Sequence, residues 1–261
     1  MSKIIDNIND IETIVSKQDT LVSGTNIKTI NGDSVLGGGN MLVGATIDYQ
    51  EFTTSGTWTK PSGCNYVYVE AWGGGGSGRR TTGAVTGGGG GAYNAKILKN
   101  SDVASSVPIT IGSGGQGVST VNGGNSGGDT TFGSLVIARG GVRAGGSGNN
   151  NYGFGGSGAA SGQTTSIHST GDYSSGAGGG PHRTNGADSV KGGAGGGGHD
   201  GGSNAGLGGK SLDGGNGGNA SLTVSGSNGS FPSGGGGSSK SATGTDIGGN
   251  GGNGLVRVWC W

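Results

Sequence analysis

Apolar residues near the N-terminus recur at alternating intervals of four and three positions. The stripe consists of Ile4, Ile8, Ile11, Val15, Gln18 and Val22. This heptad spacing predicts a coiled coil over residues 1–23, and β-branched residues at both core positions favour a trimer. Gln18 interrupts the stripe with a polar side chain that could fix the register of the chains. An amphipathic helix packed on its own domain is the alternative, and we favour self-association because little apolar surface elsewhere in the chain could receive such a helix.

The hydrophobic pattern of residues 24–47 differs from that of the heptad stripe before them. Short apolar pieces, such as those at Ile27 and Ile30, are separated by Asn-Gly and glycine-rich turns. This punctuation predicts a small β collar, or linker, between the coil and the region that follows.

From residue 48 onward the hydrophobic pattern takes the two-residue period of β-strands. The stretch NYVYVEAW places Val67 and Val69 on one side of a strand, and the C-terminal GLVRVWCW shows the same alternation at Val256 and Val258. Strands therefore lie at both ends of residues 48–261. We predict a mainly β fold, in which these terminal strands pair in one sheet of a β-sandwich and hold both ends of the segment between them.

That segment, about residues 140–254, is almost entirely glycine, serine, asparagine, alanine and threonine, as in KGGAGGGGHDGG at positions 191–202. Each of the 71 glycines in the chain costs roughly 0.5–1 kcal/mol more than alanine to order. An ordered insert therefore needs dense backbone hydrogen bonding, which left-handed polyglycine II helices provide when they pack side by side. A flexible linker is the alternative. We favour order because a long insert closed by a terminal strand is anchored at both ends.

Charge and cysteine content exclude several classes of function. Basic and acidic residues balance at 15 each, so no broad field recruits nucleic acid or anionic lipid. No apolar run reaches transmembrane length and no signal-peptide pattern is present, which predicts no membrane insertion and synthesis in a cytosol without a secretion signal. Cys64 and Cys260 are interpreted as small apolar strand residues, forming neither a metal cluster nor a disulfide framework. The three histidines lack catalytic or metal-binding spacing, so we expect no enzyme, no metal and no cofactor.

Aromatic, arginine and histidine side chains form separate islands among the glycines. They are Arg79, Arg80, Tyr152, Phe154, His168, Tyr173, His182, Arg183, His199 and Phe231. Such side chains at exposed loop tips are the usual anchors of recognition surfaces, and they suit stacking on sugar rings. Packing against a neighbouring glycine segment is the alternative for each single residue. As a group, they predict a binding surface built from the tips of loops.

Five motifs follow one another over about residues 50–261. They are FTTSGTWTKPSGCNYVYVEAWGGGGSG, GGGGGAYNAKIL, PITIGSGGQG, GGDTTFGSLVIARGG and GGNGLVRVWCW. In this order they resemble the glycine-rich domain of bacteriophage tail fibres. NIKTINGDSVLGGGN is likewise similar to a segment common near the distal ends of trimeric tail fibres. The insert carries no motif that aligns with this family, so no contact residue is carried over to it.

The resemblance implies a homotrimeric fibre protein of the phage virion, made in the host cytoplasm. Such a protein would join other tail proteins through its N-terminus and bind a host outer-membrane protein or surface glycan through its glycine-rich domain. Two other functions stay open. A structural collar or spacer of the tail predicts a chemically uniform insert, and an ice-binding protein predicts a regular glycine register with a flat Thr/Ala face.

Overall fold

The computed structural model describes residues 47–119, 124–145, 184–240 and 246–261. The chain divides into two compact units, Met1–Thr46 and Ile47–Trp261, and the described residues all belong to the second. The predicted coiled coil over residues 1–23 lies outside the described residues, as does the predicted collar apart from Ile47. Within the described ranges, no helix is long and apolar enough to cross a membrane.

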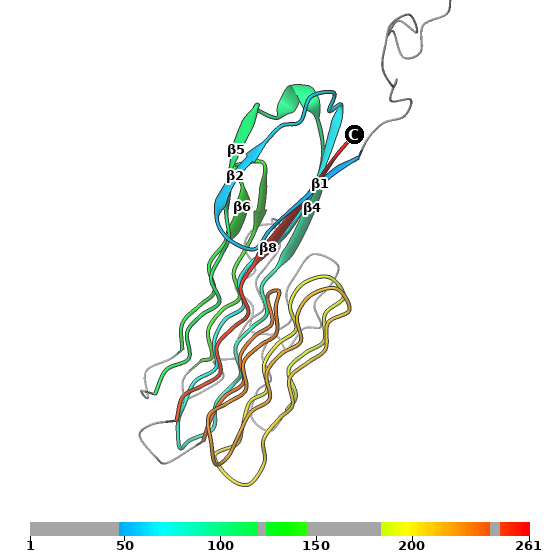
Figure 1. Cartoon of the computed structure of the whole chain (residues 1–261). Helices are drawn as coiled ribbons and strands as arrows, with labels where there is room; N and C mark the ends of the chain where they lie inside the picture. Colours follow the sequence, from blue (N-terminus) through cyan, green and yellow to red (C-terminus); the bar gives the residue numbers. More distant parts are fainter. Residues whose placement is uncertain (1–46, 120–123, 146–183, 241–245) are drawn as a thin grey trace, which may run out of the picture. The chain divides into compact units, whose positions relative to one another are not determined.

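The described residues form a mainly β fold with two four-stranded antiparallel sheets. The elements are β1 (Asp48–Phe52), β2 (Gly56–Thr59), β3 (Tyr66–Trp72), β4 (Tyr93–Lys99), the 3-10 helix η1 (Asn100–Asp102), β5 (Ser106–Thr110), β6 (Thr130–Phe132), β7 (Val136–Ala138) and β8 (Leu255–Cys260). One sheet has the order β1-β8-β3-β4 and the other the order β2-β5-β6-β7. Figure 1 shows β8, the last strand, lying between strands from the start of the unit.

The inward residues of both sheets share one hydrophobic core. Val69 and Val258 are register partners in β3 and β8 and are both fully buried. From the second sheet, Trp58 and Phe132 pack into the same cluster, with ring centroids 5.4 Å apart. Alternation along β3 and β8 puts every second side chain into this core, because successive strand residues point to opposite faces. The predicted pairing of the terminal strands is therefore confirmed.

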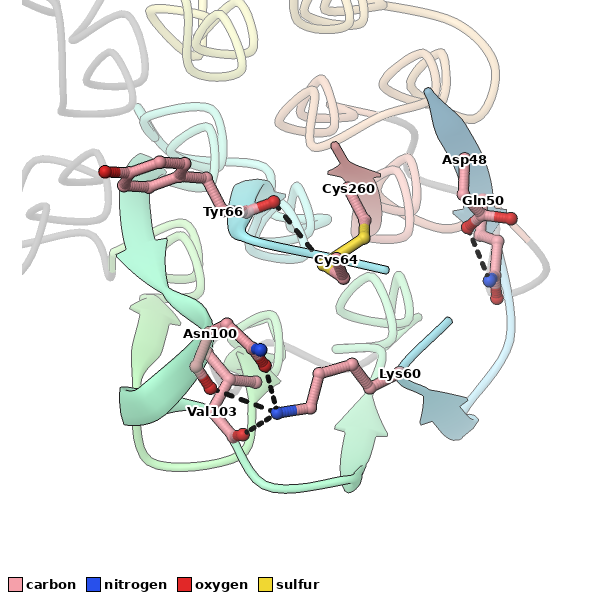
Figure 2. Close-up of a disulfide and its surroundings, with 8 residues drawn as sticks. All are labelled: Asp48, Gln50, Lys60, Cys64, Tyr66, Asn100, Val103 and Cys260. Atoms are coloured by element: carbon pink, nitrogen blue, oxygen red, sulfur yellow. Dashed lines mark hydrogen bonds between the residues drawn. A yellow bond between two sulfur atoms is a disulfide. The ribbon is translucent and has the colours of Figure 1, made fainter. Parts of the chain in front are cut away.

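A disulfide joins Cys64 to Cys260, so the interpretation of these cysteines as separate apolar residues is wrong (Figure 2). Cys64 lies two residues before β3, and the intervening Asn65 and the first strand residue, Tyr66, donate backbone hydrogen bonds to the carbonyl of Trp261. This pairing brings the two cysteine Cα atoms to 5.5 Å, although they are 196 positions apart in the sequence. The covalent link therefore encloses the whole glycine-rich segment. On the same side of the core, Lys60 Nζ donates to the carbonyl oxygens of Asn100 and Val103 (Figure 2).

Glycine-rich segments run side by side as extended chains away from the two sheets (Figure 1). We call this part of the molecule the glycine lattice. Its segments are residues 73–78, 87–92, 112–117, 124–128, 140–144, 186–189, 193–198, 206–210, 214–220, 226–230, 233–239 and 248–254. They come from the β3–β4, β5–β6 and β7–β8 connections. The lattice is thus not limited to the insert after residue 140, because all three connections extend into it.

Successive residues of a lattice segment hydrogen-bond to different neighbours. In residues 73–78 the first and fourth N–H groups donate to residues 89–92, the second and fifth to 125–128, and the third and sixth to 249–252. All six N···O distances are 2.8–2.9 Å. Every third residue therefore returns to the same neighbour, and a segment can bond to three surrounding segments at once. This arrangement satisfies buried backbone groups that belong to neither helix nor sheet.

At many glycine positions the lattice segments lie too close together for a side chain to fit between them. A Cβ atom added at Gly75 would lie 2.1 Å from the carbonyl oxygen of Gly234, and one at Gly196 would lie 2.1 Å from that of Gly236. Both distances are far below van der Waals contact, and the obstructing atoms belong to the backbone. Glycine is therefore required at these positions by the close approach of the chains.

The lattice is fastened to the first sheet at Trp72. The Trp72 Nε1 group donates to the Lys191 carbonyl at 2.7 Å, and the Trp72 and Tyr93 ring centroids lie 5.0 Å apart. Lys191 Nζ lies 5.6 Å from the centre of the Tyr93 ring and also forms an ion pair with Asp213. The turn around residue 191 is thus held by an aromatic pair at the end of β3 and β4.

Replacing Trp72 by phenylalanine keeps an aromatic ring at this junction and removes the indole donor. Because this hydrogen bond to the Lys191 carbonyl would be lost at a part-buried site, Trp72→Phe should lower the free energy of unfolding by about 1–2 kcal/mol. Urea unfolding followed by circular dichroism measures the change. Trp261→Phe, at the far end of the same sheet, is the matched control and should cost clearly less; equal losses in both variants would contradict the fastening role of Trp72.

Candidate functional site

The glycine lattice has two ends that differ in their surroundings. Turns at residues 190–192, 211–213 and 231–232 lie at the sheet end, where Lys191 meets Trp72. The other end, which we call the distal end, contains residues 79–86, 118–119, 199–204, 220–225 and 239–240, and it lies away from the sheets in Figure 1. It is built by connections that are far apart in the sequence, so it gathers short turns of varied composition in one place.

The structure brings Arg79, Arg80 and His199 together at the distal end. Arg79 forms a backbone bridge with Val118, Arg80 with Ser239, and His199 with both Val85 and Ala205. These three were predicted together as exposed contact residues. They share one end of the lattice, but the exposure of Arg79 and His199 differs from the expectation.

Arg79 and His199 are buried, with 6% and 0% of their surfaces exposed, and this corrects the expectation that they stand at exposed loop tips. The physical reason is that both continue the hydrogen bonding of the lattice. His199 and Val85 exchange backbone hydrogen bonds of 3.0 and 2.9 Å, and the N–H of Gly201 donates to His199 Nδ1 at 3.2 Å. His199 therefore packs within the distal end.

Arg79 has an environment that is unfavourable for a charged group. Burial, with a smaller contribution from the positive charge of Arg143, lowers the pKa of the Arg79 guanidinium below its usual value. Its Nη1 donates to the carbonyl of Gly145 at 3.4 Å. Arg80 is half-buried beside it. Both arginines are thus placed to hold the distal turns together.

The other predicted contact residues are not placed with these three. Phe231 is 51% exposed, but it lies in a turn at the sheet end, where the neighbouring Pro232 carbonyl accepts a hydrogen bond from Gly215. The remaining six lie outside the described residues: Tyr152, Phe154, His168, Tyr173, His182 and Arg183. The predicted trimerisation residues also lie outside them: Ile4, Ile8, Ile11, Val15, Gln18 and Val22.

The exposed chemistry of the distal end is largely polar. Asp200 orders its own turn, since Oδ1 accepts from the N–H groups of Gly202 and Asn204, at 2.7 and 3.3 Å, and Oδ2 accepts from the Asn204 side chain at 3.0 Å. Lys240 donates to the carbonyl of Gly202. Val224 is an exposed apolar side chain on the neighbouring turn. Hydroxyl, amide and charged groups around a small apolar patch suit hydrogen bonding to a polar surface. Among the described residues, no group of three or more His, Cys, Asp or Glu is placed to hold a metal ion.

A second functional feature, which the sequence analysis missed, is a set of side-chain acceptors along the edges of the lattice. At these edges a side-chain oxygen takes the place of a neighbouring carbonyl: Asn185 accepts from Leu207 N, Asp188 from Lys210 N, Asn216 from Ser211 N, Asn219 from Gly208 N, Asn250 from Gly117 N and Asn253 from Gly114 N, at 2.6–2.9 Å. The acceptors recur three residues apart, matching the repeat of the lattice bonds. The sequence signal is NGAD at 185–188 and NGGN at 216–219 and 250–253.

One of these edges also borders an open groove of about 540 Å³. Its walls are residues 184–188 on one side and 207–210 on the other. Asn185 and Asp188 bridge the two walls through the hydrogen bonds just described. The side-chain oxygens of the groove thus serve to join the walls.

Removing one edge acceptor should leave an N–H group of the lattice without its partner. We expect Asn219→Ala, which deprives the Gly208 N–H of its acceptor, to lower the free energy of unfolding by about 1 kcal/mol. Asn219→Asp is the matched variant, because Asp188 already performs this role with a carboxylate oxygen. Thermal melts compare the two. A melting temperature lowered as much by aspartate as by alanine would contradict the capping role.

Comparison with known proteins adds one finding. No curated protein matches the chain. A known family described as a glycine-rich domain matches residues 51–260, from within β1 to the end of β8, and so spans both sheets and the lattice. The chain therefore belongs to the glycine-rich domain family.

Proposed function

We propose that this protein is a bacteriophage tail-fibre tip that binds a receptor on the host surface through the distal end of its glycine lattice. The five ordered motifs that resemble tail-fibre domains support this proposal. So does the family membership of residues 51–260, although the family description names no function. The receptor would be an outer-membrane protein or a surface glycan, and the protein would act by binding, without catalysis.

The observation that carries the proposal is the separation of a glycine scaffold from turns that carry larger side chains. Inside the lattice, a Cβ atom at Gly196 or Gly236 would meet a backbone oxygen at 2.0–2.1 Å, so these positions tolerate no side chain. Inside the lattice the remaining residues are mostly small, such as Ala92 and Ala194, and the larger side chains lie in the turns and along the edges. A rigid scaffold with varied turns at one end is the arrangement of many recognition proteins, and ordered turns lose little entropy on binding.

The proposal includes two finer structural statements. The lattice segments would be polyglycine II helices, which the three-residue repeat of lateral hydrogen bonds supports. The chain would form a homotrimer through the heptad stripe of residues 1–23 and join other tail proteins at that end. Three distal ends on one fibre would multiply weak contacts through avidity. The protein would then reside in the virion tail after synthesis in the host cytoplasm.

Binding of the labelled full-length protein to bacterial cells tests the proposal. The panel should include strains lacking surface polysaccharides and strains lacking individual porins. A distal double variant, Asn204→Ala/Val224→Lys, should weaken binding to the susceptible strains at least tenfold, a loss of about 1.4 kcal/mol. The matched sheet-end variant, Leu212→Lys/Phe231→Ala, should bind like the unmodified protein.

Two outcomes would contradict the proposal. Cell binding could fall with the sheet-end variant and persist with the distal variant, which would place the contact elsewhere. Alternatively, the protein could bind no strain in the panel while inhibiting ice growth in a thermal-hysteresis assay, which would favour the ice-binding alternative.

A further inference from the structure

A row of large side chains crosses the first sheet on the face turned away from the core. The register aligns Tyr49, Trp259, Tyr68 and Ile97 directly across β1, β8, β3 and β4. The ring centroid of Trp259 lies 5.0 Å from that of Tyr49 and 5.4 Å from that of Tyr68. Tyr49 is 48% exposed and Ile97 is 62% exposed. The row is therefore a continuous, open strip of apolar surface.

We call Tyr49, Tyr66, Tyr68, Ile97 and Trp259 the outer aromatic face. The lattice covers the other end of the same sheet face, where the turn around residue 191 buries Trp72 and Tyr93, and it does not cover this strip. Clustered aromatic side chains on the outside of a sheet are typical of contact surfaces, because each ring buries a large area at a small cost in entropy.

The acidic groups beside the outer aromatic face are balanced by basic ones and are already hydrogen-bonded within the sheet. In the next row, Glu51 accepts from Arg257 Nε and from the Tyr49 hydroxyl, both at 2.9 Å. The hydrogen bond from Arg257 is the main cause that lowers the pKa of Glu51.

Glu70 accepts from the hydroxyls of Tyr68 and Tyr93, at 3.1 and 2.7 Å. The two acidic residues, Glu51 and Glu70, are matched in number by two basic residues, Arg257 and Lys99. Lys99 lies across from Tyr66 in the strand register. Around a three-fold axis this face of each chain can approach those of the other two, and a nearly neutral face does so without opposing like charges.

The chain reaches this face from its N-terminal segment. β1 is an edge strand of the sheet, and residues 1–46 lead directly into it. The heptad stripe at residues 4–22 predicts a trimer, and chains joined there would all continue into this sheet.

We propose that the outer aromatic face is the surface through which copies of this chain pack against one another. The inference depends on the proposed function in one respect, namely that the chain forms a trimer. Copies fit this face better than a glycan does, because the two carboxylates beside the rings, which a sugar would need as hydrogen-bond acceptors, are engaged within the sheet.

Photo-crosslinking of the full-length protein tests the inference. The exposed residue Tyr49 is replaced by p-benzoylphenylalanine, and Leu212, which is 81% exposed on a lattice turn, receives the same replacement as a control. Illumination should give covalent dimers and trimers from the Tyr49 protein and only monomers from the Leu212 protein. A second change, Ile97→Glu in the Tyr49 protein, should reduce the crosslinked yield roughly tenfold, because it opposes like charges across the contact.

Products confined to one chain, such as a link from position 49 to residues 1–46, would overturn the inference. So would the absence of any product, or a yield that Ile97→Glu leaves unchanged. Cell binding by the same samples separates this result from the proposed function. Cell binding without crosslinks would reject the contact between copies and would be consistent with receptor binding. Crosslinks without cell binding would support the contact between copies and would count against receptor binding.

Discussion

Gly196→Ala should destabilise the protein by about 3 kcal/mol or more, although it adds a single methyl group. The new Cβ would lie 2.1 Å from the carbonyl oxygen of Gly236 and 2.5 Å from its carbon. Gly196 also donates its N–H to Gly88 at 2.8 Å, so a shift of either chain would break lateral hydrogen bonds. Overpacking costs typically 1–3 kcal/mol, and each lost hydrogen bond adds about 1 kcal/mol. Chemical denaturation followed by tryptophan fluorescence measures the loss.

Gly56→Ala is the matched control for this substitution. Gly56 lies in β2, and a Cβ atom there would meet nothing within 4 Å. Alanine at such a site should be neutral or stabilise the protein by about 0.5 kcal/mol, because it restricts the unfolded chain. If both variants lost the same stability, glycine would not be required by the close packing of the lattice.

Removing the Cys64–Cys260 disulfide should produce a loss of similar size. The bond spans 196 positions, and a loop of that length corresponds to about 5 kcal/mol of unfolded-state entropy. The double variant Cys64→Ala/Cys260→Ala should therefore unfold at a clearly lower denaturant concentration. Its folded state keeps small apolar groups at two buried positions, so the change acts mainly on the unfolded chain.

Reducing agent provides the control for this prediction. Dithiothreitol should lower the unfolding midpoint of the unmodified protein to about that of the double variant, and it should leave the double variant unchanged. A midpoint that responds to neither treatment would show that β8 is held by its pairing with β1 and β3 alone.

The core of the fold could be predicted from the sequence because strand alternation directly encodes which side chains face inward. Val67, Val69, Val256 and Val258 show the two-residue period, and all four are buried in the same cluster. The disulfide could not be predicted in this way. Cys64 and Cys260 are brought together by the register of β3 and β8, and no local spacing signals a contact between such distant positions.

The exposure of the candidate site residues was predicted less well, and His199 shows the physical reason. Polar residues among glycines usually point into solvent, so exposure was the natural expectation. In the lattice, however, the backbone on both sides of a segment is bonded, and His199 is enclosed by Val85 and Ala205. The edge acceptors Asn219 and Asp188 were missed because, in the sequence, each looks like an ordinary polar residue on a solvent-exposed turn. Their role as acceptors for lattice N–H groups can be recognised only once the three-residue repeat of the lattice is known.

Amide hydrogen exchange over residues 192–202 tests most directly whether the glycine-rich segments form an ordered scaffold. The N–H groups of Gly193, Gly196 and His199 donate to residues 91, 88 and 85, at 2.8–3.0 Å. We predict that these amides exchange slowly, as the core strands do, whereas those of the exposed turn at residues 222–224 exchange much faster. Exchange at residues 193–199 as fast as in an unstructured linker would contradict the lattice and, with it, the display of binding turns on a rigid glycine scaffold.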